Sequence, residues 1–315
     1  MTCTKCQHQT CKKFGYFGKR RIQRWRCQSC STTFCQPHTK LTRDTMAANP
    51  DATARALHCL LEGCSIRSTE RLTGLNRNTI MRLLIVAGER STRLMDSKMR
   101  GLKPRYLQCD EIWTFVQKKQ KRADRNDSLI GDQWVFVAID AETKLVPSFV
   151  VGKRTNAITL AFLRDLRSRL ADTRFQLTTD GFHFYQLGVE DVFGGNADFA
   201  QLVKLFGDFG QGPDARYSPP RITEVISKVR NGRPDPKHIS TSFVERQNLT
   251  MRMQMRRFTR LTLGFSKKLS HLKAAINLHF AYYNFCRVHS SLRVTPAMEA
   301  GLTDHAWSIG ELLNA

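Results

Sequence analysis

Residues 106–116 read Tyr-Leu-Gln-Cys-Asp-Glu-Ile-Trp-Thr-Phe-Val, a run apolar enough for a buried strand that carries the pair Asp110-Glu111 near its middle. A buried strand rarely holds an ionised side chain without a partner, because desolvating a lone carboxylate costs several kcal/mol. A divalent cation is one such partner. Since alternate residues of a strand face opposite sides, we predict that Asp110 is a metal ligand and that Glu111 has a structural role.

Two later stretches supply further carboxylates. Residues 175–181, Phe-Gln-Leu-Thr-Thr-Asp-Gly, predict a strand that ends on Asp180, and residues 242–248, Ser-Phe-Val-Glu-Arg-Gln-Asn, open a basic helix with Glu245. The chain between these positions is long enough for strands and a helix to bring the acidic side chains together. The predicted ligands of this metal site are Asp110, Asp180 and Glu245.

The order of elements around these carboxylates predicts the fold class. Residues 133–140 and 145–151 read as second and third strands, and residues from Asn156 to about Arg169 read as a helix. Hairpin-linked strands, a crossover helix and a parallel strand describe an α/β, RNase H-like core with a mixed five-stranded sheet. Residues 186–240, rich in Gly, Pro and Arg, predict a basic insertion that faces DNA, or equally a solvated loop.

The overall charge points to a polyanionic partner. The chain has 315 residues and a formal net charge of +23, from 50 Lys and Arg against 27 Asp and Glu. This balance favours nucleic acid and salt-sensitive binding, although ribosomal and membrane-surface proteins share it. No apolar run reaches the roughly 18 residues needed to span a bilayer, and the N-terminus has no apolar signal-peptide core. We therefore expect a cytoplasmic, nucleoid-associated protein without a membrane partner.

Two Cys-x-x-Cys pairs stand near the N-terminus. Four thiolates in two close pairs make the closed tetrahedral site of structural Zn²⁺, and a segment this short needs such a metal to fold. Other residues that could replace a ligand are Cys11, Cys35, His8 and His38. The predicted zinc ligands are Cys3, Cys6, Cys27 and Cys30. No position is left for water, so this site is expected to be structural.

Residues 46–100 predict a helical module. A helix from Pro50 to about Glu62 is followed by a short helix, a turn containing Gly74 and a longer helix, which is the spacing of a helix-turn-helix motif. In such a motif the start of the second helix meets DNA, and an ordinary helical linker is the alternative. The predicted DNA contacts are Arg77, Asn78 and Arg82.

The sequence resembles bacterial and archaeal insertion-sequence transposases of the insertion-sequence-one type. The resemblance rests on residues 110–116, Asp-Glu-Ile-Trp-Thr-Phe-Val; 179–181, Thr-Asp-Gly; 243–252, Phe-Val-Glu-Arg-Gln-Asn-Leu-Thr-Met-Arg; and 282–284, Tyr-Tyr-Asn. It implies a zinc-ribbon module in residues 1–45, a helix-turn-helix domain in residues 46–100, an RNase H-like catalytic domain in residues 101–295 and a C-terminal tail in residues 296–315.

The same resemblance implies an activity. Enzymes of this type use an Asp-Asp-Glu triad, here Asp110, Asp180 and Glu245, to hold two Mg²⁺ ions, which Mn²⁺ could replace. Arg252, two helical turns after Glu245, belongs to the same signature and could contact a phosphate. The implied partners are the double-stranded DNA of the element ends and of the target, bound by a homodimer or higher oligomer.

Two other functions remain open from the residues alone. A non-catalytic DNA-binding regulator would need only the cysteine and helical modules, and it would bind DNA without the carboxylates. An RNase H-fold nuclease or resolvase would cut DNA without joining ends. The long segment between Asp180 and Glu245 departs from the family pattern.

Overall fold

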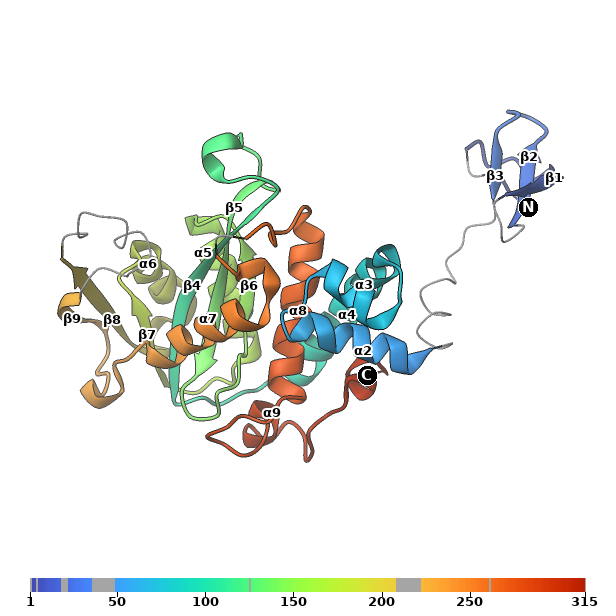
Figure 1. Ribbon diagram of the computed structural model, residues 1–315. Coiled ribbons are helices and arrows are strands. Elements are labelled where there is room, and N and C mark those ends of the chain that lie inside the picture. Colours follow the sequence, from blue (N-terminus) through green and yellow to red (C-terminus); the bar gives the residue numbers. More distant parts are fainter. Residues whose placement is uncertain are drawn as a thin grey trace. The chain divides into compact units, whose positions relative to one another are not determined.

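The computed structural model describes residues 2–3, 5–17, 22–35, 49–124, 126–207, 222–260 and 262–314. The chain divides into two compact units, Met1–Asn49 and Pro50–Ala315 (Figure 1). Among the described residues, no helix combines the length and apolar character that a bilayer span requires.

The first unit is a small antiparallel sheet in the order β1-β2-β3. Its strands are β1 (Cys11–Phe17), β2 (Ile22–Cys27) and β3 (Thr33–Cys35). Among its described residues only Cys3 and Cys27 are buried. A unit whose buried side chains are thiols has almost no apolar core, so its fold depends on what the thiols bind.

The second unit is built on a six-stranded sheet in the order β6-β5-β4-β7-β8-β9. The strands are β4 (Tyr106–Val116), β5 (Gly131–Asp140), β6 (Phe149–Gly152), β7 (Phe175–Asp180), β8 (Ala197–Phe206) and β9 (Ile222–Asn231). β4 pairs antiparallel with β5 and parallel with β7, and β7 pairs parallel with β8. The central strand β4 therefore has hydrogen-bonded neighbours on both sides.

Helices cover both faces of this sheet. The helices next to it are α5 (Asn156–Arg169), α6 (His183–Phe193) and α7 (Ser242–Gln254). Short 3₁₀ segments are η1 (Gln120–Arg122), η2 (Gly194–Asn196), η4 (Pro236–His238) and η5 (Arg256–Phe258). α7 packs on β4 and β5, whereas α5 packs on α6 and β6 (Figure 1).

A second group of helices joins the two ends of this unit. Its members are α2 (Pro50–Leu61), α3 (Ile66–Thr73), α4 (Arg77–Lys98), α8 (Leu269–Phe285), α9 (Pro296–Glu299) and α10 (Ile309–Asn314). α4 and α8 make the largest helix contact. They meet at Gly88, where an added Cβ would lie 2.5 Å from Ala274 Cα. Only glycine permits this close approach.

The structure corrects two details of the predicted sheet. It has six strands rather than five, because the segment predicted as an insertion contains the strands β8 and β9. The glycines and prolines that suggested a break stand in connections or in residues 208–221, which lie outside the described residues. The third strand also begins later than expected, at Phe149, since Pro147 has no backbone N–H for sheet pairing.

Candidate functional site: a carboxylate cluster on the sheet

Asp110 lies on β4 beside the last residues of β7, in a register that pairs Cys109 with Thr179. Its Oδ1 accepts the Glu111 N–H at 2.8 Å, and its Oδ2 accepts the Asn248 side-chain amide at 2.8 Å. Asn248 belongs to α7, so Asp110 faces that helix.

Asp180 is the final residue of β7, the parallel neighbour of β4. Its Oδ1 accepts the Phe182 N–H at 3.0 Å, and Arg154 Nη2 lies 3.7 Å from its Oδ2. The carboxylate is thus held at the end of a strand, where the chain leaves the sheet.

Glu245 stands in the first turn of α7. It accepts a hydrogen bond from Thr241 Oγ1 at 2.6 Å and forms an ion pair with Lys204 of β8. The helix is fixed by Gln108 of β4, whose buried Oε1 accepts the N–H groups of Phe243 and Val244 at 2.9 and 3.2 Å. One side chain of the Asp110 strand therefore caps the helix that carries Glu245.

Glu111 faces the opposite side of β4, as the strand period predicts. Its Oε2 accepts Arg154 Nε and Nη2 at 3.1 and 2.9 Å. The Arg154 guanidinium also lies against the rings of Trp134 and Phe182, at 4.7 and 4.0 Å from their centroids. Arg154 consequently links Glu111 to Asp180 and is itself fixed by two aromatic rings.

The carboxylates are crowded and desolvated. Burial, reinforced by the charge of Asp180, raises the pKa of Asp110 to about 6 and that of Glu111 to about 8. Burial also raises the pKa of Asp180. Negative charges gathered in a poorly solvated place disfavour one another, and a cation relieves this cost.

The cluster fits a hard divalent cation. Oxygen atoms of Asp110, Glu111 and Asp180 all lie within 4.8 Å of one another. Glu111 is buried beside Tyr185, whose hydroxyl lowers the pKa of this carboxyl against the effect of burial. Carboxylate oxygens at this spacing are what Mg²⁺ and Mn²⁺ bind. Glu245 lies outside this group and pairs with Lys204, yet its charge still raises the pKa of Asp110 and Asp180.

Arg252 lies on α7 two turns after Glu245. Its guanidinium is half-buried, and burial together with the charge of Arg260 lowers its pKa, an effect that Asp110 opposes. The charges of both Asp110 and Arg260 affect Arg252, so this arginine lies between the acidic site and the basic surface.

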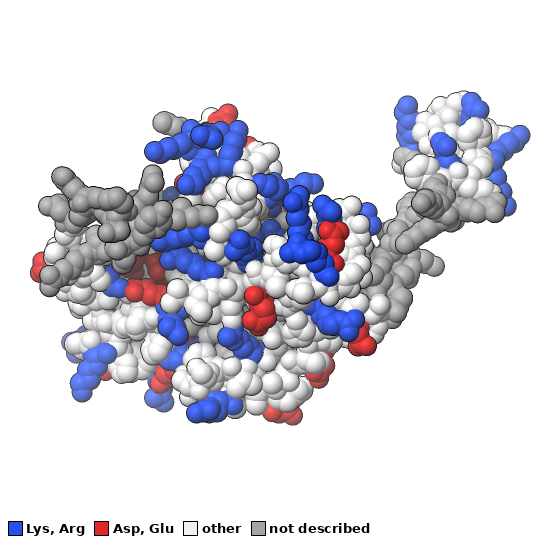
Figure 2. All heavy atoms as spheres, viewed as in Figure 1, with Lys and Arg blue, Asp and Glu red and all other residues white. Residues whose placement is uncertain are grey.

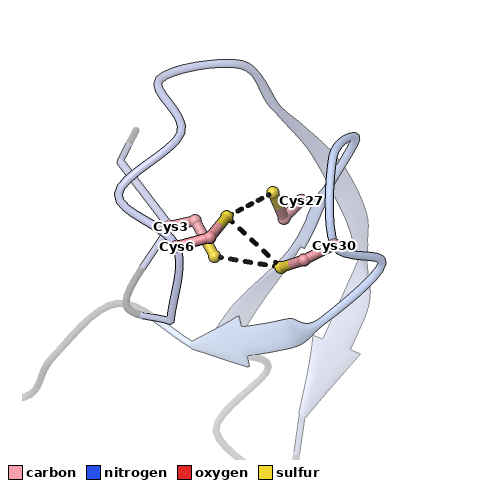
Figure 3. Close-up of side chains that lie close together, drawn as sticks. All are labelled: Cys3, Cys6, Cys27 and Cys30. Carbon is pink, nitrogen blue, oxygen red and sulfur yellow. Dashed lines mark hydrogen bonds between the residues drawn. The ribbon is translucent and has the colours of Figure 1, made fainter.

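The four predicted zinc ligands come together in the first unit (Figure 3). The Sγ atoms of Cys3 and Cys30 are 3.6 Å apart, those of Cys6 and Cys27 are 3.6 Å apart, and those of Cys6 and Cys30 are 3.4 Å apart. Zn–S bonds of about 2.3 Å in a tetrahedron place sulfurs about 3.8 Å apart. The geometry therefore fits a closed four-thiolate site.

Hydrogen bonds shift the pKa values of these cysteines in both directions: a backbone group of His8 lowers that of Cys6, but the Cys30 thiol and burial raise it, to about 12. The N–H groups of Cys30 and Ser29 lower the pKa of Cys27, and the hydroxyl and N–H of Thr32 lower that of Cys30 to about 6. Cys11, Cys35 and His8 are not part of the cluster of described residues, and His38 lies outside the described residues.

The predicted DNA-contacting residues stand at the start of α4. Arg77, Asn78 and Arg82 are all exposed. α3 and α4 are joined by a three-residue turn in which Gly74 has a φ of 71° and Asn76 caps α4 through its side chain. Arg77 Nε lies 3.2 Å from Glu70 Oε2. This arrangement matches the predicted helix–turn–helix spacing, and DNA binding by it stays a prediction.

Several residues of the carboxylate site were not predicted from the sequence. They are Gln108, Arg154, Lys204 and Asn248. Asn248 follows Glu245 by three positions, a helical spacing that places both on the face toward β4. Gln108 precedes Asp110 by two, so the strand period could have assigned it to the same face. Arg154 and Lys204 carry no comparable signal, since arginine and lysine are common throughout this chain.

No protein-family model and no curated protein sequence matches this chain. Among solved structures, one similar chain is from the piggyBac transposase synaptic complex with hairpin DNA, at 10% identity and a TM-score of 0.37, covering 83% of this chain and 68% of that one. A second is from the Mos1 strand transfer complex, at 12% identity and a TM-score of 0.22, covering 50% of this chain and 56% of that one. A third is from a pre-cleavage Mos1 transpososome, at 11% identity and a TM-score of 0.21, covering 50% of this chain and 57% of that one. Similarity this distant assigns no function.

Proposed function

We propose that this chain is a DNA transposase that cuts and joins DNA strands through a divalent-metal site formed by Asp110, Asp180 and Glu245. The observation that carries the proposal is the group of carboxylates formed by Asp110 and Glu111 of β4 and Asp180 of β7, together with the charge of Glu245 on α7, which raises the pKa of Asp110 and Asp180. The mixed sheet, in the order β6-β5-β4-β7-β8-β9, supports the proposal of an RNase H-like core.

The surface chemistry supports a nucleic-acid substrate. The chain carries a net charge of +23. On the face of residues 50–314 seen in Figure 2, Lys and Arg side chains spread widely while Asp and Glu form small groups. A cluster of acids within a basic surface is what a phosphodiester substrate needs, because the surface holds the backbone and the acids hold the cations.

Each residue has a role in this proposal. Asp110, Asp180 and Glu245 would hold two Mg²⁺ or Mn²⁺ ions, which when bound activate the attacking oxygen and neutralise the leaving oxygen of an in-line displacement. Asn248 and Arg154 orient two of the carboxylates. Lys204 pairs with Glu245 and would be free to contact a phosphate if cations bound that carboxylate.

Cleavage and joining are then the same displacement. In cleavage, a water oxygen bonds to phosphorus while the bond from phosphorus to the 3′ oxygen breaks, leaving a 3′-hydroxyl and a 5′-phosphate. In joining, that 3′-hydroxyl attacks a target phosphodiester and the target 3′ oxygen leaves. Two element ends must be brought together, so we expect at least two copies of the chain. The first unit, holding structural Zn²⁺, and the start of α4 would bind the ends.

The test is strand transfer in vitro with Mg²⁺ and a donor DNA that carries the ends of the element encoding the chain. Glu245→Gln should lower the amount of joined product at least about 100-fold, or about 2.7 kcal/mol in barrier, with thermal stability retained. Glu190→Gln, which alters an exposed residue of α6, should leave joining unchanged.

Three other results would replace the proposal. Joining that survives Glu245→Gln removes this residue from catalysis. Cleaved DNA without joined product indicates a nuclease or resolvase. Specific binding without any product indicates a regulator.

A further inference from the structure

The segment after α7 returns to the strand that carries Asp110. η5 follows α7 directly, and the Arg257 carbonyl accepts Thr114 Oγ1 of β4 at 3.4 Å. Ser266 is tied to the end of the same strand, since its carbonyl accepts the Gln117 N–H at 2.8 Å. Thr114 lies four residues beyond Asp110 on the same face of β4, about 13 Å away at the usual rise of a strand.

Arg257 has no acidic partner among the described residues. The one hydrogen bond of its guanidinium goes from Nη1 to the neutral Ser266 Oγ at 2.9 Å. Burial lowers its pKa to about 10, and no carboxylate opposes that effect. An arginine has five N–H donors, so most of its hydrogen-bonding capacity is left for another group.

Two other desolvated arginines of this unit form ion pairs with carboxylates, and for the half-buried Arg252 the charge of Asp110 opposes the effect of burial on its pKa. Arg169 binds Asp96 and Asp165 at 2.6 and 2.9 Å. Arg154 binds Glu111 at 2.9 Å. A desolvated guanidinium without a counter-charge costs several kcal/mol. Arg257 has no such counter-charge among the described residues, so binding of an anion would lower the free-energy cost of its burial.

The N-terminus of α8 adds positive charge at the same place. Ser266 lies two residues before Lys268, the N-cap, whose side chain makes no capping hydrogen bond, and the first turn holds no acid. Burial lowers the pKa of His271 in that turn, and the charges of Arg257 and Lys268 add to this effect. Unbonded N–H groups and the helix dipole favour an anion here.

We propose that Arg257, Ser266 and the first turn of α8 form a phosphate-binding site that takes a backbone phosphate of bound DNA, beside the end of β4, the strand that carries Asp110. The inference rests on the proposed function, because it takes DNA as the substrate of the neighbouring site. The guanidinium fork and the helix N–H groups together match the oxygens of a phosphodiester. Lys268 adds long-range attraction.

The first experiment measures thermal unfolding of the full-length protein in potassium phosphate and in potassium chloride of equal ionic strength, without DNA or divalent ions. Phosphate should raise the Tm of the wild type by several degrees, because it binds only the folded state. Arg257→Met should lose this phosphate effect and be no less stable than the wild type in chloride. Arg164→Met, which removes an exposed arginine of α5 paired with Asp191, should keep it.

The second experiment distinguishes DNA from free phosphate. The affinity for a short duplex is measured as a function of potassium chloride concentration, and Arg257→Met should reduce the slope of log affinity against log salt by about 1. Arg164→Met should leave the slope unchanged. Ser266→Ala keeps every charge and should weaken both effects partially, which gives a test if Arg257→Met does not fold.

Several outcomes would overturn the inference. Equal wild-type Tm values in the two salts would exclude the anion site, and a large loss of stability of Arg257→Met in chloride would make Arg257 a structural residue. If Arg257→Met loses the Tm increase in phosphate but keeps the wild-type salt dependence of DNA affinity, the site binds free phosphate and not DNA. Neither measurement depends on catalysis, so absent strand transfer with both effects intact would remove the proposed activity and keep this site.

Discussion

The molecule holds two clusters of side chains suited to metal ions, and they are built in opposite ways. The cysteine cluster comes from two Cys-x-x-Cys pairs in a short N-terminal segment, and its four soft sulfurs close around one position. The carboxylate cluster comes from two neighbouring strands, β4 and β7, and its hard oxygens lie on a folded sheet.

This difference teaches which cluster depends on metal for its fold. The first unit buries almost nothing besides thiols among its described residues, whereas the second has an extensive apolar core. We infer that metal creates the structure around the cysteines, and that the structure around the carboxylates exists before metal arrives. A closed site is then structural, and an open, strained site is free for chemistry.

The largest expected effect tests the inference that metal creates the structure around the cysteines. Replacing both Cys27 and Cys30 with Ser should remove about one Zn²⁺ per chain, unfold the first unit and abolish binding to element ends, since structural zinc contributes about 10–16 kcal/mol to such folds. Metal analysis and limited proteolysis would measure this, with residues 50–315 staying protected. The matched control, Cys11→Ser with Cys35→Ser, should keep its zinc. Unchanged zinc content and DNA affinity in the first variant would contradict the assignment.

A smaller effect concerns the strain at the carboxylates. Folding raises the pKa of Asp110 from 3.8 to about 6, so the metal-free folded protein loses stability as the pH rises through this range. In a chelator, Asp110→Asn should therefore be more stable than the wild type at pH 8 by about 1–3 kcal/mol and nearly equal to it at pH 4. Urea denaturation at the two pH values measures this difference, with Glu190→Gln as the control. A variant that is less stable at pH 8 would show that Asp110 stabilises the apo fold.

The smallest effect sharpens the view that the carboxylate site is preassembled. Arg154→Gln removes the link between Glu111 and Asp180, and the Mg²⁺ concentration for half-maximal strand transfer should rise about tenfold, as for other residues that orient metal ligands. Arg154→Lys keeps the positive charge but lacks the paired N–H donors of the guanidinium, so it should restore the Mg²⁺ requirement only in part. Direct Mn²⁺ titration separates binding from turnover. Mn²⁺ affinity that stays equal or increases would assign Arg154 to stability alone.

Much of the core could be predicted because its signals are local. The strand around Asp110, the strand that ends at Asp180 and the helix that begins near Glu245 follow from period and turn residues, and the structure confirms these elements. The cysteine pairs are equally local. β8 and β9 were missed because their sequences are flanked by glycine and proline, which obscured two strands that only pairing with β7 and each other reveals.

The site's supporting residues were harder to predict, for a physical reason. Arg154 lies in a connection between β6 and α5, and it becomes distinctive only when folding encloses it between two aromatic rings beside Glu111. Lys204 resembles any lysine of a basic chain until β8 places it against Glu245. Ion pairs between residues that are far apart in the sequence have no characteristic spacing, so sequence patterns do not predict them.

Helix α7 is attached to β4 at two points, and the spacing of these points along the strand fixes the position of the helix. Gln108 holds the first turn of α7, and Asp110 holds Asn248 one turn later. The connection between β9 and Thr241 is also anchored to the sheet, because Asp235 exchanges two hydrogen bonds with Gln176 and His238 stacks on Tyr106. One residue inserted between Val244 and Asn248 would rotate the rest of the helix by about 100°, and both attachments could no longer hold together. The spacing of residues in the first turns of α7 is therefore set by a single strand, β4.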